Sequence, residues 1–386
     1  VSISSFDIYI NYMTKLSFIN LLIFSLIFTN CKEYHSQKNF NLAPKNVIFL
    51  ISDGAGLSQI SSAYFYKDSL VHYSRFKHIG LMHTFSSDND ITDSAASATA
   101  FATGQKTYNG AIGVLEDHSS VENLVELASA KGVKSGIVTT SSITHATPAC
   151  FFAHVVNRNQ EEDIAFQLSL SEVDYFAGGG NKFFSSRGDG IDVTDSLRSK
   201  GFVLNTKWLL DFESIKNNPK QAFLLAENAM PKIMDGRGTF LRDATLLGVK
   251  FLNQKNAPFF LMAEGAQIDW GGHDNDAKYL ISELIDFDET IGAVLDFAEK
   301  DGETLVIVTS DHETGGFTLG GKKIKGADGN IDEDYNIIAP SFSTGGHSAT
   351  LIPVFAFGPG AEEFSGVFDN TEIFHKIIKL TSWNSP

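Results

Sequence analysis

The sequence has little positive charge for its length, and its cations fall well short of its anions. It contains 30 Lys and Arg residues against 46 Asp and Glu residues, which gives a formal net charge of −16. A nucleic-acid polymer is an unfavourable partner for such a chain, because no excess of cations is available to neutralise its phosphates. Small anionic substrates stay compatible with the composition if bound metal ions reverse the local charge.

Arginine and proline are scarce as well. Six arginines and 9 prolines stand beside 33 glycines. Few arginines limit the number of bidentate ion pairs, and many glycines with few prolines leave the loops loosely constrained. Heat-stable proteins typically have more ion pairs, more proline and less glycine in their loops, so this composition favours a chain that works in the cold.

The N-terminal segment has the pattern of an export signal. Lys15 precedes an apolar run over residues 16–29, and Asn30-Cys31-Lys32 follows it. A charged start, an apolar run of this length and a cysteine at the processing point are typical of a leader, and the run is short for a membrane span. We therefore expect residues 1–31 to be a signal or lipoprotein leader, with its true start at Met13 and with Cys31 as the lipid-modified residue.

This interpretation predicts export to the periplasm or a lipid anchor in the cell envelope. Plain secretion and a buried helix are the alternatives. Cysteine is rare in this sequence, so loss of the leader leaves Cys150 alone. The mature chain then has no intramolecular disulfide, and Cys150 is most simply a small buried hydrophobic residue.

From about residue 45 onward, apolar runs alternate with helical patterns. The runs expected to be strands are residues 46–51, 136–140, 258–263 and 304–309, and the clearest helix is expected at residues 276–300. Buried strands separated by helices predict an α/β fold, in which helices cover both faces of a mainly parallel central sheet in three layers. We expect residues 45–386 to form one domain with small surface insertions, among them Gly178-Gly179-Gly180 and residues 321–336.

Acidic and histidine residues follow three of the predicted strands where these end. Asp53 follows the first strand, Glu264 the third, and Asp311-His312 the fourth. The carboxyl ends of parallel strands share one edge of a sheet, so these side chains are expected to converge there. Singly, each aspartate is more simply a helix cap or turn residue and each histidine a surface residue. Their shared position favours a site for two zinc ions, to which three more ligands belong: Asp269, His273 and His347.

A run of small residues begins at Ser94, directly after Asp93. Such a run permits a helix with unobstructed backbone N–H groups at its start, where an anion and a serine alkoxide are both favoured. On these residues alone, an Ala/Ser-rich helix packed closely against a neighbour is the simpler interpretation. The metal-ligand set reverses that preference.

The run Ile91-Thr92-Asp93-Ser94-Ala95-Ala96-Ser97-Ala98-Thr99 is similar to the nucleophile signature of the alkaline phosphatase family. The resemblance extends over roughly residues 45–380 and is closest to the bacterial, cold-active branch. The family's other motifs occur here in the same order: Asp53-Gly54, Glu264-Gly265, residues 269–273, Asp311-His312-Glu313-Thr314-Gly315-Gly316 and Gly345-Gly346-His347.

The resemblance implies a metal-dependent phosphomonoesterase that is active at alkaline pH, with inorganic phosphate as its product. Ser94 would be the nucleophile that forms a phosphoserine intermediate, Arg158 would grip the phosphate, and the active protein would be a homodimer. Two Zn²⁺ ions and one Mg²⁺ ion per chain are implied. Their ligand sets would be Asp53, Asp311 and His312 for one zinc, Asp269, His273 and His347 for the other, and Asp53, Thr147 and Glu264 for the magnesium.

Two positions depart from the enterobacterial pattern. His145 stands where that version has an aspartate near the third metal, and Trp270 stands where it has a lysine. We expect both on the substrate side of the site, with rim packing as the alternative for Trp270. The identity of the third metal is the weakest part of the resemblance, because imidazole suits zinc better than magnesium.

Three other functions compete with this prediction. A sulfatase of the same superfamily needs a Cys or Ser followed by x-Pro-x-Arg, whereas Ala-Ala-Ser follows Ser94. Phosphodiesterases of the superfamily usually carry a threonine nucleophile and lack the third metal and the arginine. A non-catalytic phosphate-binding or lectin-like surface protein would not need the complete set of ligands and a nucleophile.

Overall fold

The structure is a computed structural model that describes residues 43–255, 257–326 and 330–383. The expected leader, with Met13 and Cys31, lies outside these residues. Within the described ranges, no helix has the length and the apolar character needed to cross a membrane.

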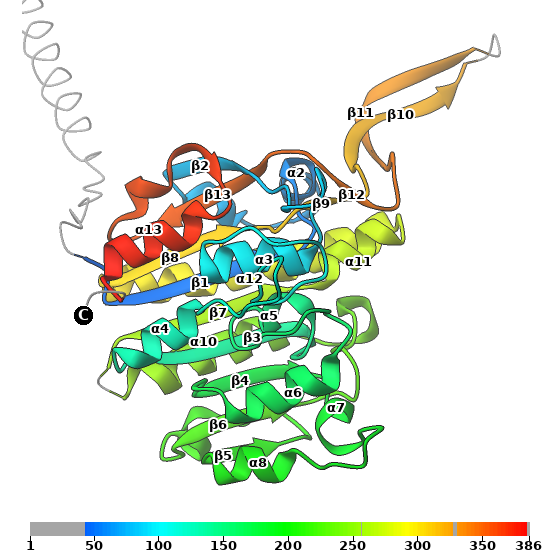
Figure 1. Cartoon of the computed structure of the whole chain (residues 1–386). Helices are drawn as coiled ribbons and strands as arrows, with labels where there is room; N and C mark the ends of the chain where they lie inside the picture. The colour runs from blue at the N-terminus through cyan, green and yellow to red at the C-terminus, as the bar shows by residue number, and fades with distance from the viewer. Residues whose placement is uncertain (1–42, 256, 327–329, 384–386) are drawn as a thin grey trace, which may run out of the picture. The chain divides into compact units, whose positions relative to one another are not determined.

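One ten-stranded sheet forms the centre of the described chain (Figure 1). Its strands are β1 (Asn46–Ser52), β2 (His78–His83), β3 (Lys134–Ser142), β4 (Tyr175–Gly179), β5 (Phe202–Asn205), β6 (Lys220–Leu224), β7 (Phe259–Gly265), β8 (Thr304–Thr309), β13 (Ile352–Phe357) and β14 (Gly366–Asp369). Across the sheet they run in the order β14-β2-β13-β8-β1-β7-β3-β4-β6-β5. Only β13 is antiparallel to its neighbours, so the predicted mainly parallel sheet is confirmed.

Helices cover both faces of this sheet (Figure 1). The α-helices are α2 (Leu57–Tyr66), α3 (Ser94–Thr103), α4 (Leu124–Ala130), α5 (Ala146–Ala149), α6 (Glu161–Leu170), α7 (Lys182–Ser185), α8 (Thr194–Ser199), α9 (Phe212–Ile215), α10 (Phe240–Asn253), α11 (Gln267–His273), α12 (Ala277–Asp301) and α13 (Glu372–Thr381). The 3₁₀ turns are η1 (His72–Arg75), η2 (Ile233–Asp235) and η3 (Ala361–Phe364).

Strand β1 shows how the sheet sorts its side chains into two cores. Val47, Phe49 and Ile51 pack on one face together with residues of α3, α4, α6 and α13. Ile48 and Leu50 pack on the other face with residues of α2, α10 and α12. Successive side chains of a strand point to opposite faces, so a continuous apolar run is what a strand buried on both sides requires. The three-layer arrangement expected from the sequence is confirmed.

The glycines at residues 178–180 were predicted to lie at the surface, and this prediction was wrong. Gly178 and Gly179 belong to β4, and all three glycines are buried. A Cβ atom on Gly179 would lie 1.9 Å from the carbonyl oxygen of Asn228. A glycine is therefore needed at position 179 because another segment of backbone packs directly on the end of the strand.

Residues 321–336 were also predicted to lie at the surface, and here the described part of the segment agrees. Strands β10 (Thr318–Lys325) and β11 (Ile331–Ser341) pair as an antiparallel hairpin that extends away from the sheet (Figure 1). Most residues of both strands are exposed. The two-residue strands β9 (Glu313–Thr314) and β12 (His347–Ser348) pair with each other and flank the hairpin in the sequence.

Candidate functional site

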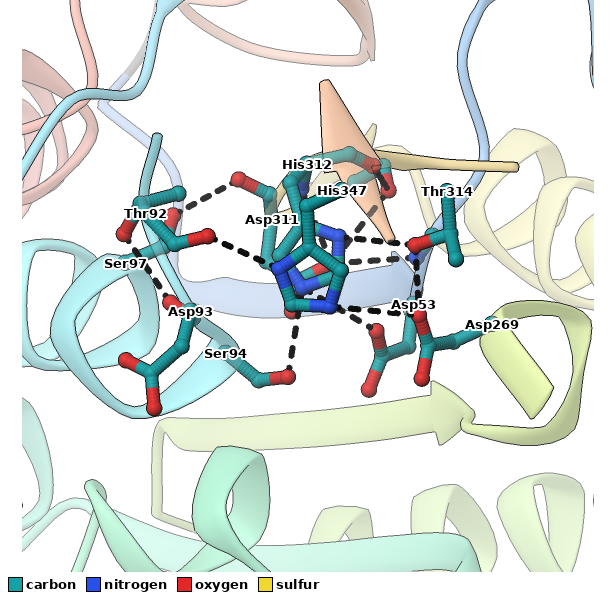
Figure 2. A network of polar contacts seen from close by, with 12 residues as sticks. Asp53, Thr92, Asp93, Ser94, Ser97, Asp269, Asp311, His312, Thr314 and His347 are labelled. Atoms are coloured by element: carbon teal, nitrogen blue, oxygen red, sulfur yellow. Dashed lines mark hydrogen bonds and ion pairs between the residues drawn. The ribbon is translucent and has the colours of Figure 1, made fainter. Parts of the chain in front are cut away.

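Helix α3 begins at Ser94, as the sequence predicted. Asp93 caps it, because its side chain accepts a hydrogen bond of 2.9 Å from the backbone N–H of Ala96. The hydroxyl of Ser94 lies 3.3 Å from Nε2 of His312, and Figure 2 shows it directed toward the aspartates and histidines of the site. Ser94 thus sits at the positive end of a helix dipole and faces a cluster of candidate metal ligands.

Asp53, Asp311 and His312 converge because β1 and β8 are neighbours in the sheet. Nε2 of His312 lies 3.7 Å from Oδ1 of Asp53 and 3.3 Å from Oδ2 of Asp311. All three side chains are fully buried. Asp269 adds a carboxylate oxygen to the same group, within 4.8 Å of the ligand atoms of Asp53 and His312.

A second group joins α11 to β12. His273 and His347 place their Nε2 atoms 3.4 Å and 3.7 Å from Oδ1 of Asp269, and 3.2 Å from each other. Nδ1 of His273 lies 2.7 Å from the carbonyl of Gly345, and Nδ1 of His347 lies 2.8 Å from the carbonyl of Thr92. A carbonyl can only accept, so in neutral rings each Nδ1 carries the proton and the two Nε2 lone pairs face one another. That arrangement is unfavourable unless a cation lies between them.

The third group lies beside β7. Oxygen or nitrogen atoms of Asp53, His145 and Glu264 lie within 4.8 Å of one another. One carboxylate oxygen of Glu264, Oε2, accepts hydrogen bonds from the hydroxyls of Thr139 and Ser141 on the neighbouring strand β3. Its other oxygen, Oε1, has no hydrogen-bond partner among the described residues.

His145 therefore lies beside two of the predicted magnesium ligands, Asp53 and Glu264, at the place near the third metal that the resemblance implied. Its expected contact with the substrate stays a prediction. Burial and the nearby Arg158 lower the pKa of His145 to about 3, so its ring is neutral and able to ligate a cation. Thr147 follows His145 by two residues and is buried on α5. Its hydroxyl forms no hydrogen bond of normal length and angle with the described residues. The ring of Trp270 meets that of His145 edge-on, with centroids 6.0 Å apart, and is partly exposed.

Arg158 reaches the site from the loop before α6. Its Nη1 lies 2.9 Å from Oδ2 of Asp93, and its Nη2 lies 3.4 Å from Nε2 of His145. Burial lowers the pKa of Arg158, and Asp93 more than compensates, so the guanidinium remains charged. Asp93 thus holds one side of the guanidinium while it caps the helix that carries Ser94.

The carboxylates at the centre of the site lack the partners that buried charges require. Both oxygens of Asp53, Oδ2 of Asp311 and Oε1 of Glu264 have no hydrogen-bond partner within the described ranges. Burial raises the pKa of Asp53 well above its usual value, and Asp311 and Asp269 raise it further. Burial also raises the pKa of Glu264 to about 7. Divalent cations fit here, because they would satisfy the free oxygens and remove the repulsion between the carboxylates.

Three contributors to the site were not assigned a role from the sequence. Asp93 was quoted only as part of the signature, although an acid before a small-residue helix is a recognisable cap. Thr314, which contacts Asp269 and His312, was quoted only as part of a motif. Thr139 lies in a strand that was predicted, but its contact with Glu264 depends on strand order, which the sequence does not reveal.

Comparisons with known proteins agree with this geometry. The profile of the alkaline phosphatase family matches residues 44–341. Alkaline phosphatase 3 of Bacillus subtilis is 32% identical over 418 residues, which cover 88% of this chain and 89% of that protein. The solved alkaline phosphatase of the Antarctic bacterium TAB5 is 58% identical, with a TM-score of 0.87, over 89% of this chain and 99% of that one.

A histidine-to-aspartate variant of the TAB5 enzyme, solved with Mg bound in its M3 site, superposes on this chain with a TM-score of 0.88. It is 58% identical over 89% of this chain and 99% of that one. The profile match alone extends over more than half of the sequence, and the relatives are matched along most of their length. The chain belongs to the alkaline phosphatase family.

Proposed function

We propose that this chain hydrolyses phosphate monoesters at alkaline pH, with Ser94 as the nucleophile. The observation that carries the proposal is the position of the Ser94 hydroxyl, which lies at a helix N-terminus and 3.3 Å from Nε2 of His312. Beside it are buried carboxylate oxygens that have no hydrogen-bond partner among the described residues. With a divalent cation held by those carboxylates, the hydroxyl of Ser94 could be deprotonated and could attack phosphorus without a histidine acting as base.

Two Zn²⁺ ions and one Mg²⁺ ion are the proposed cofactors. Asp53, Asp311 and His312 would hold one zinc, and Asp269, His273 and His347 the other. Asp53, Thr147 and Glu264 would hold the magnesium, with His145 close enough to join them. When bound, the zinc ions would lower the pKa of the serine and of a water molecule and would neutralise charge on the ester oxygens.

The chain's own residues supply orientation and charge. The start of α3 places Ser94 and directs partial positive charge at an incoming phosphate. Arg158 presents a planar pair of N–H groups, which suits two non-bridging phosphate oxygens, and Asp93 keeps that plane in position. Trp270, at the partly exposed side of the site, would contact the substrate without adding charge.

Hydrolysis of p-nitrophenyl phosphate and of its bis-ester, each with and without chelator, tests the proposal. We expect fast, chelator-sensitive hydrolysis of the monoester and slow hydrolysis of the diester. A preference for the diester would indicate a phosphodiesterase. A sulfate ester cleaved faster than the phosphate would indicate a sulfatase, and phosphate binding without turnover would indicate a binding protein.

We also propose a homodimer, in which a second copy of the chain covers the hairpin β10–β11 and helix α2. An isolated two-stranded hairpin is marginally stable in water, yet Tyr335 and Ile331 are 79% and 74% exposed. Helix α2 adds exposed Tyr64 and Phe65 near the base of the hairpin, where Tyr66 hydrogen-bonds to the carbonyl of Ile338. Sedimentation at micromolar concentration should give the dimer mass, and Tyr335→Asp with Phe65→Asp should give the monomer mass.

The chain is further proposed to be exported, with residues 1–31 as its leader and Cys31 as a lipid attachment site. Expression with and without Cys31→Ser, followed by fractionation of the envelope, tests this. The lipid anchor requires that the wild-type chain is recovered with the membrane and the variant in the soluble fraction. Turnover that is retained in the cold would support a cold-adapted enzyme, as the composition hints.

A further inference from the structure

Thr314 is fixed at the point where the two predicted zinc groups meet. It is fully buried, and its backbone N–H donates a hydrogen bond of 3.0 Å to the carbonyl of Gly54. Gly54 is the residue that follows Asp53 in the sequence. In the two-stranded pair of β9 and β12 it lies opposite His347. The backbone of Thr314 is therefore attached to a segment that carries a ligand of one group and to a segment that carries a ligand of the other.

Its hydroxyl contacts a ligand from each group. Oγ1 lies 2.5 Å from Oδ1 of Asp269 and 3.1 Å from Nδ1 of His312 (Figure 2). A hydroxyl has one proton, and an ionised carboxylate can only accept. The hydroxyl of Thr314 therefore donates to Asp269 and must accept from His312, which places a proton on Nδ1 of that ring.

This proton assignment fixes the other nitrogen of His312. In a neutral ring with Nδ1 protonated, Nε2 keeps its lone pair. That lone pair lies among Oγ of Ser94, Oδ1 of Asp53 and Oδ2 of Asp311 at 3.3 Å, 3.7 Å and 3.3 Å. Nε2 is thus the nitrogen that faces the proposed metal position and the nucleophile.

The other two histidines are oriented differently. His273 and His347 donate through Nδ1 to backbone carbonyls, as described above. Nδ1 of His312 instead donates to a side chain, the hydroxyl of Thr314, and the same hydroxyl donates to Asp269. A single substitution at Thr314 can therefore disturb both groups, whereas no single carbonyl can be removed by mutation.

We propose that Thr314 is a positioning residue that couples the two zinc sites, since its one hydroxyl sets the tautomer of His312 and orients Asp269. This inference rests on the proposed function, because it concerns the metals that the function needs. Outer hydrogen bonds of this kind typically change metal affinity by about 10- to 100-fold. Loss of the hydroxyl is thus expected to weaken both zinc sites together.

Zinc isotherms of the full chain test the proposal. Wild type, Thr314→Val, Thr314→Ser and Thr103→Val would be dialysed against buffers of graded free zinc with excess magnesium, and the zinc bound per chain counted. Thr103 is a matched control, because its buried hydroxyl also has two partners, the carbonyl of Thr99 at 2.7 Å and the N–H of Gln105 at 3.3 Å. Neither partner of the Thr103 hydroxyl is a candidate metal ligand.

Thr314→Val should move both zinc transitions to about 10- to 100-fold higher free zinc. Thr314→Ser, which keeps the hydroxyl, and Thr103→Val should follow the wild-type isotherm. A shift in only one transition would overturn the coupling, and an unshifted Thr314→Val isotherm would overturn the role altogether. If wild type itself binds no zinc, it is the proposed function that fails.

A measurement on wild type keeps the proposal testable even if Thr314→Val does not fold. Long-range ¹H–¹⁵N correlation of ¹⁵N-histidine-labelled, zinc-loaded protein reports which ring nitrogen carries the proton. We expect the proton of His312 on Nδ1. A proton on Nε2 would contradict the hydrogen-bond assignment to Thr314.

Discussion

The described chain holds two groups of buried carboxylates, one at the ends of the strands and one on helix α12, and their surroundings differ. Glu283 and Asp286 of α12 share the guanidinium of Arg237, whose side chain is fully buried. The remaining oxygen of Glu283 accepts from the backbone N–H of Ile233 at 2.9 Å. Among the described residues, no lysine or arginine forms an ion pair with Asp53 or Glu264, and several of their oxygens have no hydrogen-bond partner.

The pKa shifts follow this difference. Burial raises the pKa of Glu283, and the neighbouring Arg237 opposes the rise. At Asp53 burial raises the pKa, and the neighbouring carboxylates Asp311, Asp269 and Glu264 raise it further. The group on α12 is neutralised by an arginine in direct contact, whereas Arg158 forms its ion pair with Asp93 and acts on Asp53 only from farther away. The strand-end group is therefore left to be neutralised by a cation from solution. The group on α12 braces the loop before α10, whereas the group after the strands is suited to hold metal ions.

The largest expected effect lies at the nucleophile beside the unpaired carboxylates. Ser94→Ala should lower turnover of p-nitrophenyl phosphate by several orders of magnitude, since the covalent route is lost. The zinc content should stay at the wild-type value because Ser94 is not a proposed protein ligand. Trapping of labelled phosphate on the protein measures the intermediate, and a phosphoenzyme that persists in the variant would refute the assignment.

Removal of the arginine from the other group should affect stability rather than catalysis. Arg237→Met leaves Glu283 and Asp286 buried without a counter-ion, and breaking such a pair typically costs about 3 to 5 kcal/mol. Urea unfolding of the zinc-loaded chain measures the loss. Zinc content and kcat of the folded fraction should remain near wild type. A variant as stable as wild type would show that the two groups do not differ as described.

Arg158 lies between the two cases, since it is paired with Asp93 but faces the proposed phosphate. Charged hydrogen bonds contribute about 1.5 to 3 kcal/mol each, so Arg158→Ala should lower kcat/KM for monoesters by about 10- to 1000-fold. Diesters carry fewer charged oxygens, so their loss should be smaller. Equal losses for both substrates would exclude Arg158 as the phosphate clamp.

The metal-free chain should be less stable at high pH because of Glu264. Its folded pKa of about 7 lies above the ordinary value of 4.5, so the protonated form is favoured by folding. This contribution to the free energy of unfolding is complete below the ordinary pKa and is lost as the pH rises through about 7. In chelator, Glu264→Gln should lose less stability than wild type as the pH rises from 4.5 to about 7. Above pH 7 it should be the more stable of the two proteins.

The matched substitution on α12 sharpens this test. Glu283→Gln should destabilise the chain at neutral pH, since it removes a charge that Arg237 needs. Thermal unfolding of both variants in chelator, across the same pH range, shows whether each substitution raises or lowers the stability of the chain. If both substitutions changed the stability in the same direction above pH 7, the distinction between the two groups would be contradicted.

The smallest effect is expected at Trp270. A lysine there would add a cation near a dianionic product, and an ion pair at a partly exposed site is worth about 1 kcal/mol or less. Trp270→Lys should therefore tighten inhibition by inorganic phosphate by about fivefold at low salt and less at high salt, with lower kcat and KM. If the inhibition constant at low salt does not change, Trp270 only packs at the rim.

Much of this organisation could be predicted from the sequence, because the signals are local. Continuous apolar runs identified β1, β7 and β8, and acids that follow strands in a parallel sheet must converge. The buried glycines of β4 could not be placed, since the segment that packs on Gly179 is distant in the sequence. The brace of Arg237 and the double contact of Thr314 also depend on tertiary proximity, which no periodicity reveals.

The buried carboxylates of the site are expected to bind metal ions, and Ser94 is expected to act as nucleophile only when those ions are bound. The most direct test strips the full chain with chelator, restores magnesium, and titrates zinc while bound zinc and phosphomonoesterase activity are followed together. We predict negligible activity in the stripped chain and recovery in parallel with zinc, complete at two zinc ions per chain. Full activity without zinc, or zinc binding at that stoichiometry without activity, would contradict the account.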